Sequence, residues 1–293
     1  AQNVQNAWSQ VDDHLSTLTP EGLTVIGGLG RGGFGVVVSV VHQVRGIPQQ
    51  FAMKCISKSR SSQKKDKELL GRELRALRDL PRSTVFFVTD LVGGGDLFYH
   101  LDVVTREGKA GFPEHQARVL LAETAMALCH MHDHNFIHRD IKVENVMLSS
   151  DGHVKLVDYG LCCQVSSAEG VSTKPVGSLI YIALEMLYES FSGHFTDWWA
   201  LGILGHELLK GRSPWSSLTN RKQIKWEIMN APLLSPLGGI SEVVSEFIVA
   251  LTAIRRESRL GFARSRNVLS HRFFTESLDM DALERGEAPP SGV

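Results

Sequence analysis

A short stretch near the middle of the chain collects the side chains that phosphate chemistry uses. Residues 138–145 read HRDIKVEN, and Asp158 follows thirteen positions after Asn145, in the sequence DYG. Carboxylate and amide oxygens are ligands that Mg²⁺ prefers, and a lysine beside them can neutralise a phosphoryl group. The spacing therefore predicts a site that holds metal ions against phosphate.

Each polar side chain in this stretch suits one part of such a reaction. Asp140 can accept a proton from an attacking hydroxyl or orient that hydroxyl, while Lys142 can neutralise the transferred group. Asn145 and Asp158 offer hard oxygen ligands to Mg²⁺. Phosphoryl transfer depends mainly on positioning and charge neutralisation, which this set of residues can supply.

A glycine-rich segment at 29–38, LGRGGFGVVV, has the spacing G-x-G-x-x-G through Gly30, Gly32 and Gly35. Glycines let backbone N–H groups approach phosphate oxygens without side-chain clashes. A dinucleotide-binding fold needs this motif between a strand and a helix, whereas here a β-branched run follows at 36–41. We therefore expect the glycines to form a β-hairpin that binds phosphate, and this expectation excludes a dinucleotide-dependent oxidoreductase.

A lysine on an apolar strand, Lys54 in FAMKCI, calls for a partner because burying an unpaired cation is costly. Glu73 lies nineteen residues further on, in a helix predicted over 66–80 from the spacing of Leu70 and Leu77. Pairing with Glu73 would place Lys54 to hold phosphates. The alternative is that both are solvated surface residues.

The composition excludes several other classes of protein. The chain has 293 residues, 31 basic and 32 acidic, and its net charge of −1 argues against a general nucleic-acid binder. Its longest apolar run, at 198–204, is far too short to span a membrane. The four cysteines match no zinc-binding spacing, and their small number and the lack of an apolar leader predict an intracellular, cytoplasmic protein.

A histidine-rich segment, HMHDHNFIH at 130–138, raises the possibility of a different metal site. His130 and His134 stand four positions apart, as two zinc ligands on one helix would. No further ligand follows at a suitable spacing. We therefore favour solvated histidines at a helix end and a structural role for His138.

Strand patterns come first along the chain and helical patterns later. β-Branched runs punctuated by glycines predict three strands over 23–56, and a fourth is expected at 84–92. Pro113 opens a predicted helix with one apolar face. A run that is apolar nearly all round, 197–211, predicts a central buried helix ended by its glycine. Shorter elements are expected at 153–159 (a strand) and at 219–230 and 241–254 (two helices).

Taken in order from Gly30 to Arg259, these motifs resemble the signature set of the eukaryotic protein kinases. The DIK form of residues 140–142 is similar to the serine/threonine type rather than the tyrosine type. Further segments resemble the AGC group, which includes the cyclic-nucleotide-dependent and C-type kinases. They are GGGDLFYHL (93–101), DGHVKLVDYGLC (151–162), DWWALG (197–202), SRLGF (258–262) and LDMDALERGEAPP (278–290).

The resemblance implies an α+β, two-lobed protein kinase fold. A small lobe of antiparallel β-sheet plus one helix would bind ATP, and a larger, mainly α-helical lobe would carry the catalytic and substrate-binding residues. The expected divisions are 1–20 for an N-terminal lead-in, 21–92 for the small lobe, 93–275 for the large lobe and 276–293 for the start of an AGC-type C-terminal tail. A regulatory domain or subunit is compatible with this layout.

The resemblance also implies roles for individual residues, with ATP and Mg²⁺ as cofactors. Asp140 would be the catalytic base, Lys142 a phosphate contact, and Asn145 and Asp158 the Mg²⁺ ligands. The expected nucleotide-binding residues are Gly30, Gly32, Gly35, Val37, Ala52, Lys54, Glu73, Asp90 and Asp96.

Structural residues follow from the same resemblance. Glu185 would pair with Arg259, and Asp197 would anchor the catalytic loop at His138 and Arg139.

Acidic side chains in basophilic kinases receive substrate arginines upstream of the phosphorylated residue. The matching positions here are Asp96, Glu144 and Glu207, and Ser178 completes the expected substrate-binding set. The resemblance therefore implies protein substrates with Arg at positions −3 and −2 from the phosphorylated Ser or Thr. The alternative for Asp96 is that it binds only the ATP ribose.

The chain departs from the family pattern between Glu73 and Thr89, which are sixteen residues apart. This segment is longer in the family and normally holds the outer strand beside the Glu-bearing helix. Its shortening weakens the support for a Lys54–Glu73 pair and favours an alternative, a pseudokinase-type scaffold that binds nucleotide with impaired catalysis. The full set of catalytic groups favours the enzyme. The ALE and DWW segments, within 183–199, argue against a small-molecule phosphotransferase.

Two further departures concern single residues. Tyr159 replaces the usual Phe of the metal-binding motif and adds a hydroxyl that needs a hydrogen-bond partner. Lys174 stands where AGC kinases usually carry a phosphorylated Thr. We therefore expect activation to bypass that switch or to use Thr173 or Ser172.

Overall fold

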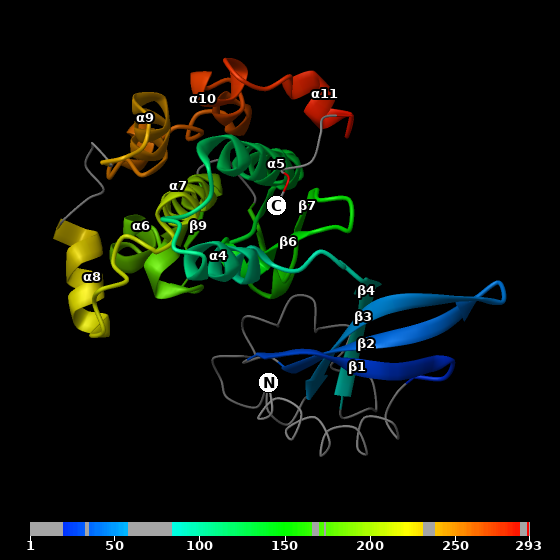
Figure 1. Ribbon diagram of the computed structural model, residues 1–293. Coiled ribbons are helices and arrows are strands. Elements are labelled where there is room, and N and C mark those ends of the chain that lie inside the picture. The colour runs from blue at the N-terminus through cyan, green and yellow to red at the C-terminus, as the bar shows by residue number, and fades with distance from the viewer. Residues whose placement is uncertain are drawn as a thin grey trace. The chain divides into compact units, whose positions relative to one another are not determined.

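The computed structural model describes residues 20–32, 35–57, 84–165, 170–172, 174–230, 238–287 and 292. The chain divides into two compact units, Ala1–Val92 and Gly93–Val293, and Figure 1 labels their elements. The helix predicted over 66–80 lies outside the described residues, together with Glu73, and so does Thr173.

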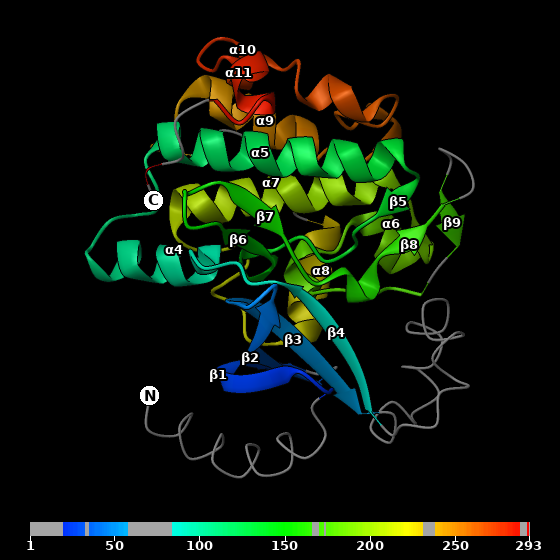
Figure 2. The ribbon, with the colours of Figure 1, turned by 90° about the vertical axis from the view of Figure 1, so that its right-hand side faces the viewer.

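The first unit is built on one antiparallel sheet whose strands follow one another in the order β1-β2-β3-β4 (Figure 2). They are β1 (Leu23–Gly32), β2 (Gly35–Val44), β3 (Ile47–Ser57) and β4 (Thr84–Asp90). Arg45 and Gly46 join β2 to β3 with φ of 54° and 80°. Two residues of positive φ give a turn whose twist matches that of the flanking strands. The strands predicted over 23–56 and at 84–92 are thus confirmed, although β4 ends at Asp90.

Alternation along β2 and β3 gives this sheet a buried face. The buried side chains are Val38, Val40, Met53 and Cys55. Successive side chains of a strand point to opposite faces, so Lys54 lies on the other face of the sheet. There it is half-buried and stands opposite Val37 of β2.

The glycine-rich segment forms a hairpin in which Gly32 of β1 stands opposite Gly35 of β2. Gly35 has a φ of 156°, and a Cβ at this position would collide with the backbone carbonyl oxygen of Cys55. Only glycine fits both the conformation and the close approach. The prediction that a strand rather than a helix follows the glycines is confirmed.

The second unit is mainly helical, with α7 (His194–Lys210) packed against α5 (Glu114–Asp133) and α9 (Glu242–Leu251) (Figure 2). Pro113 precedes α5 as predicted, because proline lacks the N–H that would be unsatisfied there. The other helices are α4 (Leu97–Arg106), α6 (Leu184–Tyr188), α8 (Arg221–Asn230), α10 (Arg272–Thr275) and α11 (Met280–Glu284).

Short elements complete this unit. The paired strands are β5 (Phe136–Ile137) with β8 (Cys163–Gln164), β6 (Val146–Leu148) with β7 (Val154–Leu156), and β9 (Val171–Ser172) with β10 (Phe191–Ser192). The 3₁₀ turns are η2 (Val143–Asn145), η3 (Tyr159–Leu161), η4 (Leu179–Tyr181), η5 (Arg256–Ser258) and η6 (Ser265–Val268).

Helix α7 is the buried centre of the second unit. Fourteen of its seventeen residues are buried, and Trp198 and Trp199 are fully so. The helix ends at Gly211, whose φ is 67° and whose missing side chain leaves room for the carbonyl oxygen of Ala110. The central buried helix predicted at 197–211 is confirmed, although it begins three residues earlier.

Some boundaries differ from prediction for local reasons. The strand expected at 153–159 is reduced to β7, because Asp158 turns the chain with a φ of 59°. The helices expected at 219–230 and 241–254 are present as the shorter α8 and α9. With a sheet in the first unit and helices in the second, the α+β prediction is confirmed. None of the helices within the described ranges has both the length and the apolarity that crossing a bilayer requires.

Candidate active site

The loop after β5 brings Asp140 and Lys142 into direct contact. Lys142 Nζ lies 2.9 Å from Asp140 Oδ2 and 3.0 Å from Ser178 Oγ. Asp140 Oδ1 accepts hydrogen bonds from the N–H of Ser178 at 3.1 Å and from its hydroxyl at 3.2 Å. Asp140 is buried, and a buried carboxylate needs such compensation because an unpaired charge is costly. The structure therefore joins a predicted catalytic base, a predicted phosphate contact and a predicted substrate-binding residue.

Asn145 ends the η2 turn and is oriented by Asp140. Its amide Nδ2 donates to the backbone oxygen of Asp140 at 2.7 Å and to Oδ2 at 2.9 Å. With both amide hydrogens committed, the remaining polar atom of the side chain is the acceptor Oδ1, the kind of atom that binds a cation. The carbonyl of Asn145 also accepts a hydrogen bond from the N–H of Val157 at 3.0 Å. This bond ties Asn145 to the segment that leads into Asp158.

Asp158 lies at the start of η3 in a left-handed conformation, with φ 59° and ψ 68°. That region costs about 1–2 kcal/mol for most residues, and Asp is one of the few that visit it routinely. Its exposed carboxylate accepts a bond from the N–H of Gly160 at 3.4 Å. The hydroxyl of Tyr159 donates to the carbonyl of Leu156 at 3.1 Å, so the partner that this substitution needs is present. Burial and the neighbouring Cys162 raise the pKa of Tyr159, which keeps the hydroxyl a neutral donor.

Asp197 of α7 holds the backbone of the loop that was predicted to be catalytic. Its Oδ2 accepts the N–H of His138 and its Oδ1 the N–H of Arg139, both at 2.8 Å. His132 Nε2 lies 2.9 Å from Oδ2 and completes the shell around this fully buried carboxylate. Burial alone would raise the pKa of Asp197, but the hydrogen bonds and the imidazoles of His132 and His138 outweigh it and lower the pKa.

His132 is a residue that the sequence analysis missed. The histidines on either side of it, His130 and His134, have the spacing of two zinc ligands on one helix. His132 continues the apolar face of α5, four residues after Leu128, and it is 3% exposed. Its Nδ1 lies 2.9 Å from Ser265 Oγ. Its spacing of four residues from Leu128, on the predicted apolar face of the helix, is the signal that would have identified His132 as a buried structural residue.

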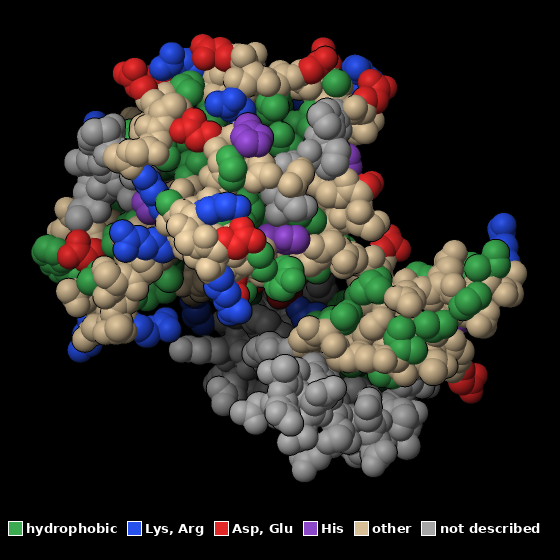
Figure 3. All heavy atoms as spheres, in the orientation of Figure 1, with side chains coloured by type: hydrophobic (Ala, Val, Ile, Leu, Met, Phe, Trp, Pro, Cys, Tyr) green, Lys and Arg blue, Asp and Glu red, His purple; other side chains and the backbone are tan. Residues whose placement is uncertain are grey.

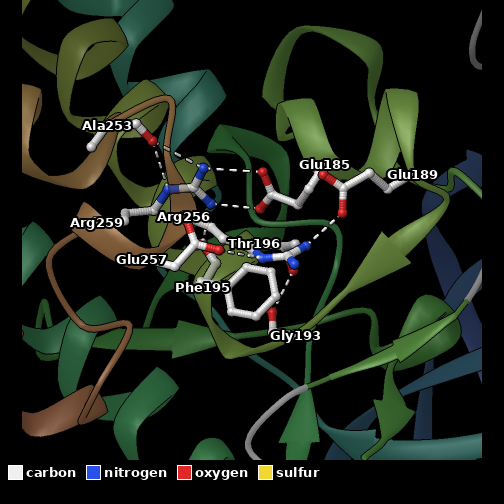
Figure 4. Close-up of polar contacts among 9 residues, drawn as sticks. All are labelled: Glu185, Glu189, Gly193, Phe195, Thr196, Ala253, Arg256, Glu257 and Arg259. Atoms are coloured by element: carbon white, nitrogen blue, oxygen red, sulfur yellow. Dashed lines mark hydrogen bonds and ion pairs between the residues drawn. The ribbon is translucent and has the colours of Figure 1, made fainter.

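Glu185 and Arg259 form a buried bidentate ion pair (Figure 4). Arg259 Nη1 and Nη2 lie 2.6 and 3.0 Å from the two carboxylate oxygens, and the side chains are 0% and 4% exposed. The guanidinium also donates to the backbone oxygens of Phe195 and Ala253 and lies 5.1 Å from the ring of Trp199. The pair therefore joins α6, the start of α7 and the segment after α9.

The three acidic residues predicted to receive substrate arginines lie in two places. The hydroxyl of Tyr181 donates to Glu207, and burial, followed by repulsion from Glu144, raises the pKa of Glu207. Glu144 is exposed and lies close enough to Glu207 to act on it electrostatically. Asp96 instead caps α4, where it accepts the N–H of Tyr99 at 2.8 Å, and it bridges to Met147 of β6.

Those predicted nucleotide-binding residues of the first unit that the structure describes belong to its sheet. Gly30 and Gly32 lie on β1, Gly35 and Val37 on β2, Ala52 and Lys54 on β3, and Asp90 at the end of β4. Ala52 stands between Ser39 and Thr89 in the register of the sheet. A Lys54–Glu73 pair stays a prediction, because Glu73 lies outside the described residues.

The donor set of the second unit fits Mg²⁺ shared with phosphates. Asn145 and Asp158 supply an amide oxygen and a carboxylate, which are hard ligands. In the part of the chain that the structure describes, no group of three or more His, Cys, Asp or Glu side chains could hold a metal ion. Mg²⁺ is typically held by one or two protein ligands together with phosphate and water oxygens, so two side chains are enough.

Comparison with known families agrees with this geometry. The protein kinase domain matches residues 23–274, which is most of the chain. The chain therefore belongs to the protein kinase domain family, and the two-lobed kinase fold implied by the resemblance is confirmed.

Curated relatives place the chain within that family. It is 30% identical over 289 residues to the serine/threonine-protein kinase Sgk1 of Danio rerio. The matched region covers 94% of this chain and 64% of that relative. It is 31% identical over 285 residues to the protein kinase C zeta type of Oryctolagus cuniculus, covering 89% of this chain and 47% of the relative. The protein kinase C epsilon type of the same organism is 32% identical over 281 residues, and the match covers 89% of this chain and 37% of that relative. These relatives are serine/threonine kinases of the AGC group, which confirms the resemblance. The chain spans about a third to two thirds of their length.

Proposed function

We propose that the chain is a serine/threonine protein kinase that transfers the γ-phosphoryl group of ATP, with Mg²⁺, to protein substrates. The observation that carries this proposal is the hydrogen-bonded cluster of Asp140, Lys142, Asn145 and Ser178. Membership of the kinase family and its serine/threonine kinase relatives support it.

Each residue of this cluster has its own role in the proposed phosphoryl transfer. Asp140, fixed by Ser178 and Asn145, accepts the proton of the substrate hydroxyl or orients it for attack. Lys142 contacts Asp140 and Ser178, so its ammonium would stand beside a substrate hydroxyl bound at Asp140 and could neutralise the transferred phosphoryl group. Asn145 Oδ1 and the Asp158 carboxylate would hold Mg²⁺, which when bound neutralises phosphate charge.

Substrate choice follows from the acidic residues. Glu207 is half-buried beside Glu144, and the repulsion between them would be relieved by a cation. An arginine guanidinium from a substrate supplies that cation and can bind a carboxylate through two parallel hydrogen bonds. We therefore include a preference for Arg at −3 and −2 in the proposal, with Asp96 as a third acidic contact.

The second candidate is a nucleotide-binding scaffold without turnover. It is favoured by the short stretch between Glu73 and Thr89. A helix that carries Glu73 would lose the support of an outer strand. Both candidates bind ATP, but only the kinase transfers its phosphoryl group.

Phosphate incorporation into a serine peptide with Arg at −3 and −2 tests the proposal. We expect activity that depends on MgATP, that Asp158→Asn abolishes, and that falls when Gln replaces the two arginines. ATP binding, followed by thermal shift, should survive in Asp158→Asn. ATP binding without phosphate transfer by the unmodified chain would support the scaffold, and equal activity on both peptides would refute the preference for arginine.

A further inference from the structure

Helix α8 presents a face to solvent that the proposed reaction does not use. The helix buries Ile224 and Ile228, whereas Trp226 is 58% exposed. Residues three and four positions apart share one side of a helix, so Lys222 and Met229 lie on the same side as Trp226. Tryptophan that faces water forgoes a large gain from burial, and it is enriched in protein interfaces.

A groove adjoins this face. Met229 lines it from α8, Tyr188 and Leu184 from α6, and Ile254 from the segment after α9, and its volume is about 310 Å³. Leu184 is buried, while Tyr188 and Ile254 are 59% and 48% exposed. The groove therefore combines apolar side chains that remain partly open to solvent, which could anchor a large side chain, with the charged residues Glu185, Glu189, Arg255, Arg256 and Glu257.

The acidic residues of the groove each pair with an arginine of the same chain (Figure 4). Arg256 contacts Glu189 at 2.6 Å and Glu257 at 3.1 Å, and it also lies 5.0 Å from the ring of Phe191. Glu185 is held by the buried Arg259. Arg255 also lines the groove and is exposed, so three arginines balance the charge of the three carboxylates, and little net attraction is left for a cationic ligand.

The cationic side chains of α8 differ from these carboxylates in their exposure and pairing. Arg221, Lys222 and Lys225 are exposed, and they form no ion pair among the residues that the structure describes. Glu227 is the acidic residue within α8, so the helix carries a net positive charge. In Figure 3, Lys and Arg side chains lie beside hydrophobic ones in the part of the surface where α8 is labelled in Figure 1.

We propose that α8 and this groove form a docking surface for an acidic segment of a partner protein. The segment would insert a Leu or Phe side chain between Tyr188, Met229 and Ile254, and its Asp and Glu residues would lie against Lys222 and Lys225. Charge complementarity selects the class of partner, and the exposed aromatic residue together with the groove supplies the anchor. The surface is independent of the transfer reaction and can act in a kinase or in a scaffold.

Binding of a short fluorescein-labelled peptide that alternates Leu and Phe with Asp and Glu tests this proposal, measured by anisotropy at low and high salt. A peptide with Asn and Gln in place of the acidic residues is the matched probe. We expect Trp226→Ala to weaken binding by about tenfold. Lys222→Glu and Lys225→Glu should each weaken it by about threefold or more and reduce its dependence on salt.

Two variants act as controls. Phe98→Ala removes an exposed aromatic side chain from α4, and Lys155→Glu reverses an exposed charge on β7, so both should leave the peptide affinity unchanged. Equal binding of the acidic and amide peptides, or an equal effect of Trp226→Ala and Phe98→Ala, overturns the proposal. So would dimerisation in sedimentation that Trp226→Ala abolishes, or stronger binding of single-stranded DNA than of the peptide. None of these readouts involves phosphate transfer, so a failed kinase assay leaves them unaffected.

Discussion

Replacing Arg259 by alanine isolates the contribution of the buried ion pair with Glu185. The substitution removes a guanidinium that is fully buried and leaves the carboxylate of Glu185, 4% exposed, without its partner. The backbone oxygens of Phe195 and Ala253 lose their side-chain donors as well. Three elements that the arginine joins therefore lose their common contact.

The magnitude follows from the burial of the pair. Removing one partner of a buried ion pair costs about 3–5 kcal/mol, because the remaining charge is neither hydrated nor paired. For a unit the size of Gly93–Val293, each kcal/mol lowers the melting temperature by about 2–4 °C, so the expected decrease is about 6–20 °C. The double variant Glu185→Leu, Arg259→Met should recover most of this loss, because apolar residues of similar volume need no counter-ion.

Urea and thermal unfolding, followed by circular dichroism, measure this effect. Arg272→Ala is the matched control, since Arg272 pairs with Glu246 on the surface, where both side chains are about half exposed. It should change stability only slightly, because water and salt screen an exposed pair. If Arg259→Ala is no more destabilising than Arg272→Ala, or if the double variant is no more stable than Arg259→Ala, the reasoning from burial is wrong.

Three further predictions concern titration, the hairpin and catalysis. Burial lowers the pKa of His194 and of His206 from 6.5 to about 4, so the unfolded chain binds protons that the folded chain excludes. Stability should therefore fall as pH decreases from about 6.5 to 4, and His194→Asn and His206→Asn should each flatten a plot of melting temperature against pH. Gly35→Ala should weaken ATP binding in a thermal-shift titration, because the new Cβ would displace the backbone at Cys55, and unchanged binding would contradict this view of the hairpin. Asp140→Asn should lower kcat by about 100-fold or more with ATP binding retained, and a normal kcat would exclude Asp140 as the base.

Long elements with a clear period were predictable from the sequence. The face of α5, the glycine-rich hairpin and the buried α7 each follow from repeated apolar spacing or from glycine placement, and these signals are local. Boundaries were less predictable because single residues set them. The strand expected at 153–159 ends early at the left-handed Asp158, a conformation that a periodic pattern does not reveal.

The site was predictable as a list of residues and less so as a set of contacts. Motif spacing identified Asp140, Lys142 and Asn145, but it did not show that Asn145 turns both amide hydrogens toward Asp140. The contact between Tyr181 and Glu207, twenty-six positions apart, has no local signal. Such pairs depend on the packing of separate elements, which a single sequence does not specify.

The way in which Asp197 holds the backbone at residues 138 and 139 limits which substitutions the predicted catalytic loop can tolerate. Asp197 binds the N–H groups of residues 138 and 139, and every amino acid except proline presents that group. The side chains are constrained as well, because His138 is fully buried against the carbonyl oxygen of Val157, and Arg139 has a left-handed φ of 66° and donates from Nε to the carbonyl oxygen of Leu161. Proline at position 139 would remove the N–H that Asp197 binds and would force φ to about −65°, so it should be more damaging than the loss of the Arg139 side chain alone.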